Sequence, residues 1–212
     1  MPAAARGLGE HIPTEVKDGK LVAKRRRQIV DAAVRLFIEG GFHKTTTRQI
    51  AKAAGLAIGT LYEYVTSKED MLSLVCQAIH QEIEDSLARR LEAPAHGSRA
   101  LEAAIRAYFA VCHQMQDHIL LIYQETKSLP PESMRLVLEH ELRITGIFVK
   151  LLHQGMEDYT LRRLTPEEVE LAAHNIVVLG HMWAFRRWSL SKSFNLERYV
   201  DLQCSLIMGE LI

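Results

Sequence analysis

The chain has 212 residues, of which 48% are apolar and 25% charged, a composition typical of a globular protein with one or two domains. No apolar run approaches the ~20 residues that cross a bilayer. The N-terminus also lacks the apolar stretch of a secretory signal, so we expect no membrane segment and a cytoplasmic location. The three cysteines lie far apart, which argues against a disulfide framework and fits a reducing compartment. We expect them to be buried as small apolar side chains.

The N-terminal quarter of the chain begins without periodicity and then becomes helical. Residues 1–22 mix proline, glycine and charge, and we expect a flexible leader. Residues 24–39 follow with apolar side chains at helical spacing, and the pair Gly40 and Gly41 is expected to end this helix.

Charge is distributed unevenly along the sequence. From Lys20 to Lys68 there are ten Lys/Arg against three Asp/Glu, a net charge of +7. From Glu69 to the end there are 14 against 20, a net charge of −6. A basic segment followed by an acidic body is typical of a nucleic-acid-binding domain joined to a domain with a second role. The alternative for the basic run at residues 24–27 is a solvated helix start.

Residues 45–65 contain two short helical patterns joined by a glycine. Thr46 precedes Gln49 by three residues, the spacing of a capping box that begins a helix. Gly55 is expected to end that helix, because a tight turn between helices commonly needs a left-handed residue. Leu61 supplies the large apolar residue that locks a second helix, as in a helix-turn-helix. The pattern predicts DNA binding, although short helix pairs with glycine turns also occur in other all-α proteins.

The rest of the sequence shows helical patterns and no alternating strand pattern. Ser67 with Asp70 predicts a capped helix start, and Thr165 followed by Pro166 predicts another. We therefore predict an all-α fold of nine helices, with a three-helix DNA-binding domain at 23–68 and a helical domain at 69–212 that shares the fourth helix. The helices expected after the helix-turn-helix span residues 67–91, 98–115, 117–128, 131–159, 166–190 and 195–212.

The last two predicted helices have apolar residues on more than one face. Residues 172–185 are apolar nearly all round, whereas a helix on the outside of a monomer would show a polar face. A glycine in a helix interior costs about 1 kcal/mol relative to alanine, so we expect another helix to approach Gly180 closely. A homodimer explains these features, and a larger monomer core is the alternative. The residues expected at the interface are Gly180, Trp183, Arg187, Leu202 and Leu206.

Candidate effector-binding residues are polar or aromatic side chains set among apolar neighbours, because ligand pockets are mostly apolar with a few placed polar groups. The alternative for each of them, which the sequence favours, is an ordinary core residue. Arg143 could meet a carboxylate or phosphate, or form an ion pair with Glu139 one turn earlier. The ten histidines show no ligand spacing with cysteine or acid, so we predict no metal site and no cofactor. The candidates are Tyr108, Phe109, Cys112, Met115, Tyr123, Arg143, Ile147, His174, Val178 and His181.

Residues 29–72, IVDAAVRLFIEGGFHKTTTRQIAKAAGLAIGTLYEYVTSKEDML, closely resemble the tetracycline-repressor (TetR) family of bacterial regulators. The segments GGF, TT-x-x-IA-x-AG, GTLY and SKEDML carry the resemblance, while Val65 stands where the pattern usually has phenylalanine. The resemblance implies a nine-helix architecture with an N-terminal helix-turn-helix domain and a C-terminal helical ligand-binding and dimerisation domain. It further implies a homodimer, usually a repressor, that a small molecule releases from a palindromic operator in double-stranded DNA.

Predicted DNA contacts come from four parts of the basic segment, of which the basic run at residues 24–27 would add phosphate or minor-groove contacts. Hydroxyl and backbone N–H groups at the start of the first helix of the pair can bind phosphate, and short residues in the second helix permit close approach to bases. If Leu61 points inward, Tyr64 should point outward, while Tyr62 could belong to the core or the surface. The resemblance implies that both tyrosines reach the DNA backbone and that Lys68 grips a phosphate. The predicted contacts are Arg26, Thr46, Thr47, Arg48, Ala57, Gly59, Thr60, Tyr62, Tyr64 and Lys68.

Other functional classes have weaker support in the sequence. The chain lacks the GxSxG, P-loop, HExxH and GxGxxG motifs, so we predict no enzymatic activity and no catalytic residues. For the regulator we expect a small apolar or amphipathic effector. One alternative is a response to acyl-coenzyme A or fatty acids, because some members of the family with similar segments regulate fatty-acid breakdown, and a drug-like or aromatic effector is equally open. Another is a helical interaction protein whose basic segment binds acidic partners without sequence preference.

Overall fold

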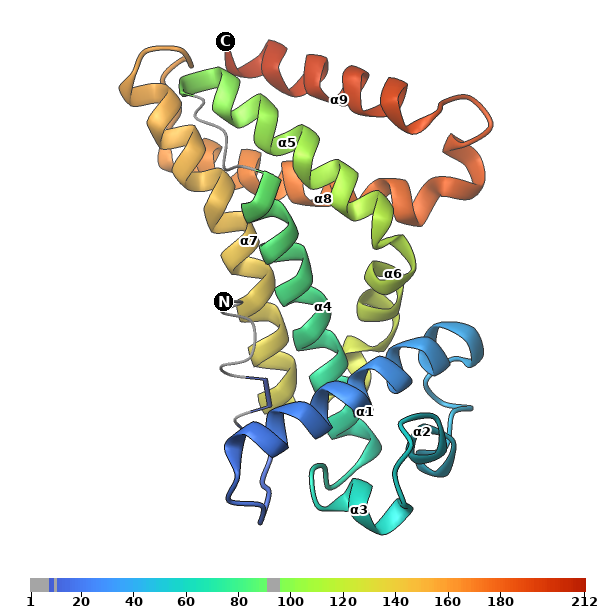
Figure 1. Ribbon diagram of the computed structural model, residues 1–212. Helices are drawn as coiled ribbons and strands as arrows, with labels where there is room; N and C mark the ends of the chain where they lie inside the picture. The colour runs from blue at the N-terminus through green and yellow to red at the C-terminus, as the bar shows by residue number, and fades with distance from the viewer. Residues whose placement is uncertain (1–7, 10, 91–95) are drawn as a thin grey trace. The chain divides into compact units, whose positions relative to one another are not determined.

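The computed structural model describes residues 8, 9, 11–90 and 96–212, and every regular element in these ranges is a helix (Figure 1). The predicted all-α fold is confirmed. None of the helices in these ranges is long and apolar enough to cross a membrane. The helices are α1 (Gly19–Gly40), α2 (Thr47–Ala53), α3 (Ile58–Tyr62), α4 (Lys68–Arg90), α5 (Gly97–Gln114), α6 (Gln116–Glu125), α7 (Pro131–Glu157), α8 (Pro166–Leu190) and α9 (Leu196–Leu211), with a 3₁₀ turn at Thr126–Ser128.

Local capping signals fix the beginnings of several helices. Thr46 caps α2 through the predicted capping box, in which the Gln49 backbone N–H donates to the Thr46 hydroxyl at 3.2 Å. Thr165 caps α8 in the same way with Glu168. Gly55 has a φ of +68° in the turn after α2, the left-handed conformation that a glycine adopts at little cost.

Other helix boundaries differ from the sequence expectation. Helix α1 begins at Gly19 instead of the predicted residue 24, because the carboxylate of Asp18 accepts from two backbone N–H groups of its first turn. Helix α3 ends at Tyr62, so the second helix of the pair has five residues. The predicted leader lies partly outside the described residues, and so does the connection between the helices expected at 67–91 and 98–115.

The chain divides into two compact units. The first comprises Met1–Glu82 and Leu121–His140, and the second comprises Ile83–Leu120 and Glu141–Ile212. Helices α4, α6 and α7 contribute residues to both units. The basic N-terminal segment therefore lies within the first unit, while the domain boundary predicted between residues 68 and 69 stays a prediction.

The core of the first unit fixes the helix-turn-helix against α1. Phe37 at the end of α1 meets Phe42 edge to face, with ring centroids 5.2 Å apart. Ile50 of α2 and Leu61 of α3 are fully buried. Val65, where the family pattern usually has phenylalanine, is also fully buried. These apolar contacts hold α2 and α3 in a fixed arrangement, since five- and seven-residue helices are too short to persist alone.

In the second unit, α5 packs against both α8 and α9. Its residues Tyr108 and Phe109 are buried, and the Tyr108 ring meets Phe148 of α7 edge to face at 5.4 Å between centroids. Cys112 of α5 and Cys204 of α9 are buried and free, as is Cys76 in the first unit. Aromatic side chains thus occupy much of the core around α5.

Candidate DNA-binding surface and effector site

The beginning of α2 offers groups suited to a phosphate. Thr47 and Arg48 lie in its first turn, and the Arg48 side chain is exposed. The Tyr62 hydroxyl donates to the Thr47 hydroxyl at 3.2 Å and thereby ties α3 to α2. Tyr62 remains 46% exposed, so its ring and hydroxyl are accessible to a second molecule. Backbone N–H groups at a helix N-terminus, a guanidinium and hydroxyls are typical phosphate-binding groups.

Helix α3 presents small side chains to solvent. Ala57 at its N-cap and Gly59 are exposed, and Thr60 is half-buried. A Cβ added at Gly59 would meet no other atom within 4 Å. Leu61 on the opposite side is fully buried and anchors the helix. Because these side chains are small, a base edge in the major groove can approach this surface of α3 closely.

Tyr64 corrects one expectation from the sequence. It was expected to point outward, but the structure buries it to 3% exposure, while Tyr62 is the exposed tyrosine. The reason is that Tyr64 lies three residues after the buried Leu61, a spacing that places both side chains on the same face of a helical turn, and the Tyr64 backbone N–H still donates to the Leu61 carbonyl at 3.1 Å. Tyr64 therefore belongs to the core of the first unit.

Lys68 is half-buried and its amine is engaged within the protein. The Nζ atom donates to the backbone carbonyls of Phe42, His43 and Thr45 at 3.0, 3.4 and 3.2 Å. It also lies 4.4 Å from the centroid of the Phe42 ring. The first residue of α4 thus anchors the loop that leads into α2. The phosphate contact predicted for Lys68 stays a prediction. Its hydrogen bonds to the loop are a structural role that residue spacing in the sequence could not reveal.

Arg26 is 4% exposed and faces the interior of the first unit. Its guanidinium donates to the backbone carbonyls of Gly9, Ile12 and Tyr64 at 2.7, 2.7 and 3.2 Å. Burial lowers the pKa of Arg26 from its ordinary value, while the nearby carboxylate of Asp70 opposes that shift. Exposed cations of this unit that a polyanion could reach include Lys24, Arg27, Arg35, Lys44, Arg48 and Lys52.

Polar side chains are buried where α5 packs against α8. The Tyr108 hydroxyl lies 2.7 Å from Nε2 of His181, and both residues are buried. Burial raises the pKa of the neighbouring Cys112 thiol to about 12, so the thiol is protonated at neutral pH. Gly180 makes this approach possible, because a Cβ there would lie 2.6 Å from Cε1 of Tyr108. The close helix approach predicted at Gly180 thus comes from α5 of the same chain.

Three buried polar atoms of the second unit have no hydrogen-bond partner within the described ranges. They are Nδ1 of His113, Oε1 of Gln116 and Nε1 of Trp183. The rings of His113 and Trp183 lie edge to face with centroids 6.1 Å apart. An unsatisfied buried polar group is costly, so atoms of this kind indicate a bound water or ligand group. Sequence patterns had not singled out His113 or Gln116.

The remaining predicted effector residues differ in burial and in the helices that carry them. Phe109 is buried, Met115 and Ile147 are half-buried, and Val178 is 52% exposed. Tyr123 lies in the first unit and is 44% exposed. The Phe109 ring lies beside that of Tyr108, with centroids 6.4 Å apart, and the effector role of all five residues stays a prediction.

Arg143 forms an ion pair with an acid other than the one expected. Its Nε atom lies 3.4 Å from Oε1 of Glu84 on α4, whereas Glu139 pairs with Arg135 at 2.6 Å. Half of the Arg143 side chain is exposed. Arg143 therefore has a carboxylate of another helix as an intramolecular partner.

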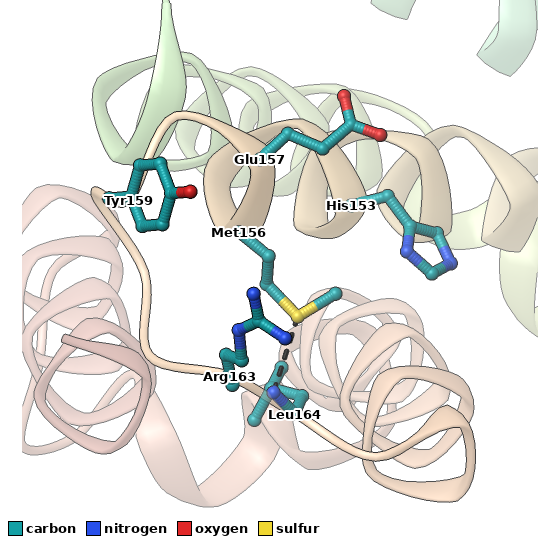
Figure 2. A pocket seen from close by; sticks show the side chains of 6 residues that line it. All are labelled: His153, Met156, Glu157, Tyr159, Arg163 and Leu164. Atoms are coloured by element: carbon teal, nitrogen blue, oxygen red, sulfur yellow. Dashed lines mark hydrogen bonds between the residues drawn. The ribbon is translucent and has the colours of Figure 1, made fainter.

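Surface hollows follow the second half of α7. One of about 410 Å³ is lined by residues of α7 and of the segment that follows it, including His153, Met156 and Arg163 (Figure 2). A second, of about 340 Å³, shares His153 and includes the predicted effector residue His174 of α8. Within the described ranges, no group of three or more metal-ligating side chains is suited to a metal ion.

The residues predicted at a dimer interface divide into two sets. Gly180 and Trp183 are buried within the chain, the latter with its ring 5.0 Å from that of Tyr199 on α9. Arg187 is exposed and lies 3.8 Å from the carboxylate of Asp117. Leu202 is half-buried, and Leu206 is 68% exposed. The interface stays a prediction, and its accessible members lie on the outer faces of α8 and α9.

A short helix pair that exposes small and basic side chains, joined to a helical unit whose apolar core holds a few buried polar groups, is typical of a helix-turn-helix transcriptional regulator with an effector domain. Comparison with known proteins agrees. Residues 29–75 match the model for bacterial regulatory proteins of the tetR family, and residues 96–202 match a tetracyclin repressor-like C-terminal domain. The chain belongs to the TetR family of ligand-responsive, DNA-binding transcriptional regulators.

Several relatives match most of the chain. The transcriptional regulator HbdR of Aromatoleum sp. (strain CIB) is 33% identical over 192 residues, covering 91% of this chain and 82% of HbdR. The repressor KstR2 of Rhodococcus jostii (strain RHA1) is 29% identical and covers 83% and 84% of the two chains. The crystal structure of AibR in complex with isovaleryl coenzyme A and operator DNA shares the fold, with a TM-score of 0.69, 17% identity and coverage of 86% and 97%.

Proposed function

We propose that this protein represses transcription as a homodimer that binds a palindromic operator and leaves it when an effector binds in the second unit. The observation that carries the DNA-binding part is the exposed surface of α2 and α3, where Arg48 and Tyr62 flank the small residues Ala57, Gly59 and Thr60. Small residues permit close approach to bases, while the flanking groups bind phosphate. We place this function in the cytoplasm.

Two copies are needed because a single five-residue α3 reads too few base pairs for a specific site. The outer faces of α8 and α9 support this pairing. Leu171 and Val178 of α8 are 63% and 52% exposed, and Leu206 of α9 is 68% exposed. Large apolar side chains spaced along two adjacent helices are typical of a surface covered by a partner. We propose that the partner is a second copy of this chain.

The DNA-binding proposal is tested by selecting duplexes from a random-sequence pool with the purified protein. We expect enrichment of a two-fold symmetric sequence and binding that weakens steeply with added salt. Sedimentation of the complex should give two protein chains per duplex or a multiple of two. Recovery of no common sequence, or of a single asymmetric half-site bound by one chain, would contradict the proposal.

For the effector we propose an amphipathic molecule with an acyl-coenzyme A thioester as the first class to test. Aromatic and apolar residues around α5 can take an acyl chain, and Tyr108 with His181 can hydrogen-bond a carbonyl. The unpartnered atoms of His113, Gln116 and Trp183 provide further sites for a polar group such as an amide. The complex of AibR with isovaleryl coenzyme A, in a protein of the same fold, supports this choice.

The effector proposal is tested by mass spectrometry of molecules that copurify with the protein and by release of the selected duplex. Thioesters of short, medium and long acyl chains are compared with free coenzyme A and with the corresponding free acids. We expect at least one thioester to release the duplex, and His181→Phe to weaken that response without changing DNA affinity. Release by an unrelated copurified molecule, with no response to any thioester, would contradict the effector class.

A further inference from the structure

A short segment ahead of α1 is folded onto the first unit, although its composition predicted a flexible leader. We call residues 8, 9 and 11–14 the N-terminal clasp. The Ile12 backbone N–H donates to the Gly9 carbonyl at 2.8 Å, and the Gly9 N–H donates to Oε1 of Gln77 on α4 at 3.1 Å. The Ile12 side chain is 3% exposed. The clasp is therefore anchored by a buried apolar side chain and by hydrogen bonds to α4.

His11 gives the clasp a further contact. Its Nε2 atom lies 3.1 Å from the Ser73 hydroxyl on α4 and 3.5 Å from the Ser133 hydroxyl on α7. Both serines are buried and belong to the first unit. A side chain of the clasp thus joins two helices of this unit.

Arg26 connects the clasp to the end of the recognition helix α3. Two of its guanidinium nitrogens donate to the clasp carbonyls of Gly9 and Ile12, and its Nε donates to the carbonyl of Tyr64. From the clasp itself, the Thr14 hydroxyl donates to the Glu63 carbonyl at 2.7 Å. Two successive carbonyls just after α3 are therefore held by the clasp and by the arginine that the clasp surrounds.

Helix α3 depends on such external contacts. It has five residues, and no side chain caps its N-terminus at Ala57. A helix of this length does not persist through its own hydrogen bonds, and the carbonyls at its end need partners. The contacts from Thr14 and Arg26 satisfy two carbonyls at the point where the chain leaves α3 and so restrict the position of the helix.

We propose that the N-terminal clasp is a positioning element for the recognition helix, and that Thr14 and Arg26 support specific DNA binding without contacting DNA. This inference rests on the proposed DNA-binding function. It assigns Arg26 a role different from the phosphate contact predicted from its basic neighbours. The clasp would hold α3 in the orientation in which Ala57, Gly59 and Thr60 face a base edge together.

Two substitutions in the full-length protein test the clasp. Gly9→Ala introduces a Cβ that would lie 2.4 Å from Cδ2 of Leu74, at a residue whose φ is +72°, and should lift the clasp from α4. Thr14→Val preserves the side-chain shape and removes the donor to Glu63. Glu15→Gln is the matched control, because Glu15 is exposed and adjacent to Thr14.

Amide hydrogen exchange of residues 58–65 and affinity for the selected duplex are measured for each variant. We expect faster exchange in this segment for both clasp variants, and specific affinity reduced about threefold to tenfold, the loss typical of one or two hydrogen bonds. Binding to a scrambled duplex should change by less than twofold, and Glu15→Gln should match the unmodified protein in every measurement.

The proposal is overturned if both clasp variants leave the exchange of residues 58–65 unchanged. It is equally overturned if affinity falls without faster exchange, since that result would indicate direct contact between the clasp and DNA. Exchange is measured without DNA, so it tests the clasp even if the unmodified protein shows no sequence preference. A lack of sequence preference in the unmodified protein would count against the proposed function, whereas unchanged exchange in the variants would count only against the clasp.

Discussion

The side-chain amine of Lys68 lies 4.4 Å from the centroid of the Phe42 ring and donates to the Phe42 backbone carbonyl at 3.0 Å. Two further carbonyls of the same loop, those of His43 and Thr45, accept from this amine. A charged donor that satisfies several loop carbonyls stabilises the approach to α2 more than an exposed lysine would. The beginning of α4 therefore stabilises the loop that leads into α2, next to the candidate DNA-binding surface.

Lys68→Met should lower the free energy of unfolding by about 1–3 kcal/mol, because charge-assisted hydrogen bonds to the loop are lost. Urea denaturation followed by circular dichroism measures this change. Lys44→Met, at an exposed lysine of the same loop, is the control and should change stability by less than about 0.5 kcal/mol. If Lys68→Met unfolded at the same urea concentration as the unmodified protein and only DNA affinity fell, Lys68 would be a phosphate contact and not a loop anchor.

Acidification should weaken the first unit through His11. Burial is the main cause that lowers the pKa of His11 below its ordinary value of 6.5, with a smaller opposing effect from Asp70 and Glu132 and a reinforcing one from Arg26. The folded protein thus favours the neutral imidazole. The contribution of neutral His11 to the free energy of unfolding is fully present above pH 6.5. It is lost as the pH falls from 6.5 toward the lowered pKa of His11 in the folded protein.

This pH dependence is measured as the difference in melting temperature between the unmodified protein and His11→Gln from pH 8 to pH 5. Comparing the two proteins removes the effect of His118, whose pKa burial also lowers. We expect the melting temperature of the unmodified protein to fall more steeply below pH 6.5 than that of the variant. Parallel curves across this range would show that His11 does not couple folding to protonation.

Gly180→Ala should destabilise the second unit by about 1–3 kcal/mol through overpacking. The added Cβ would lie 2.6 Å from Cε1 of Tyr108 and 3.2 Å from the Cys112 sulfur. The matched control is Gly146→Ala in α7, where the added Cβ would meet no side chain of the described residues beyond its chain neighbours within 4 Å, and alanine should stabilise the helix by up to about 1 kcal/mol. Thermal unfolding with opposite signs for the two variants would support this packing, whereas equal stabilisation would contradict it.

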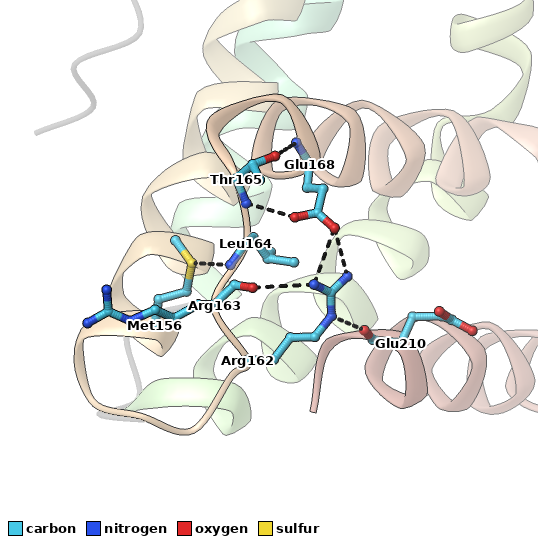
Figure 3. A network of polar contacts seen from close by, with 7 residues as sticks. All are labelled: Met156, Arg162, Arg163, Leu164, Thr165, Glu168 and Glu210. Atoms are coloured by element: carbon cyan, nitrogen blue, oxygen red, sulfur yellow. Dashed lines mark hydrogen bonds and ion pairs between the residues drawn. The ribbon is translucent and has the colours of Figure 1, made fainter.

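Arg162 joins the end of α9 to the beginning of α8 (Figure 3). Its Nε donates to the Glu210 carbonyl at 2.9 Å, its backbone N–H donates to the Leu211 carbonyl at 2.9 Å, and its other guanidinium nitrogens reach Oε1 of Glu168 at 3.2 Å. Arg162→Ala should therefore loosen the last turn of α9. If α9 lies in the dimer interface, the dimer should dissociate at about tenfold higher protein concentration.

Analytical ultracentrifugation over a dilution series measures this dissociation. Arg163→Ala is the control, since Arg163 is exposed and its guanidinium does not bridge α8 and α9. The two variants remove the same charge, so only the contacts of Arg162 differ. Equal dissociation of both variants and of the unmodified protein would place the interface away from the end of α9.

Locally encoded features could be predicted from the sequence, and features that depend on distant contacts could not. The capping residues Thr46 and Thr165 and the turn at Gly55 act within a few residues of themselves. The burial of Arg26 depends on the clasp, which has no helical or strand periodicity. No spacing rule could therefore identify its carbonyl partners.

The candidate site shows the same division. Exposure of Arg48, Ala57 and Gly59 follows from the helix-turn-helix pattern, and so does the burial of Tyr64, because it lies one turn after the buried Leu61. The polar atoms of His113 and Trp183 come together only when α5 packs against α8. Because these two residues lie about 70 positions apart in the sequence, helical periodicity cannot predict that they meet.

We propose that the surface of α2 and α3 binds DNA through Arg48 and its neighbours. The most direct test is a fluorescence anisotropy titration of the selected duplex with the unmodified protein, Arg48→Ala and the control Arg135→Ala, at two salt concentrations. We expect sequence-specific binding that weakens with salt, a loss of about tenfold for Arg48→Ala, and no change for Arg135→Ala. Equal affinity of the unmodified protein for selected and scrambled duplexes, or full affinity of Arg48→Ala, would contradict the claim.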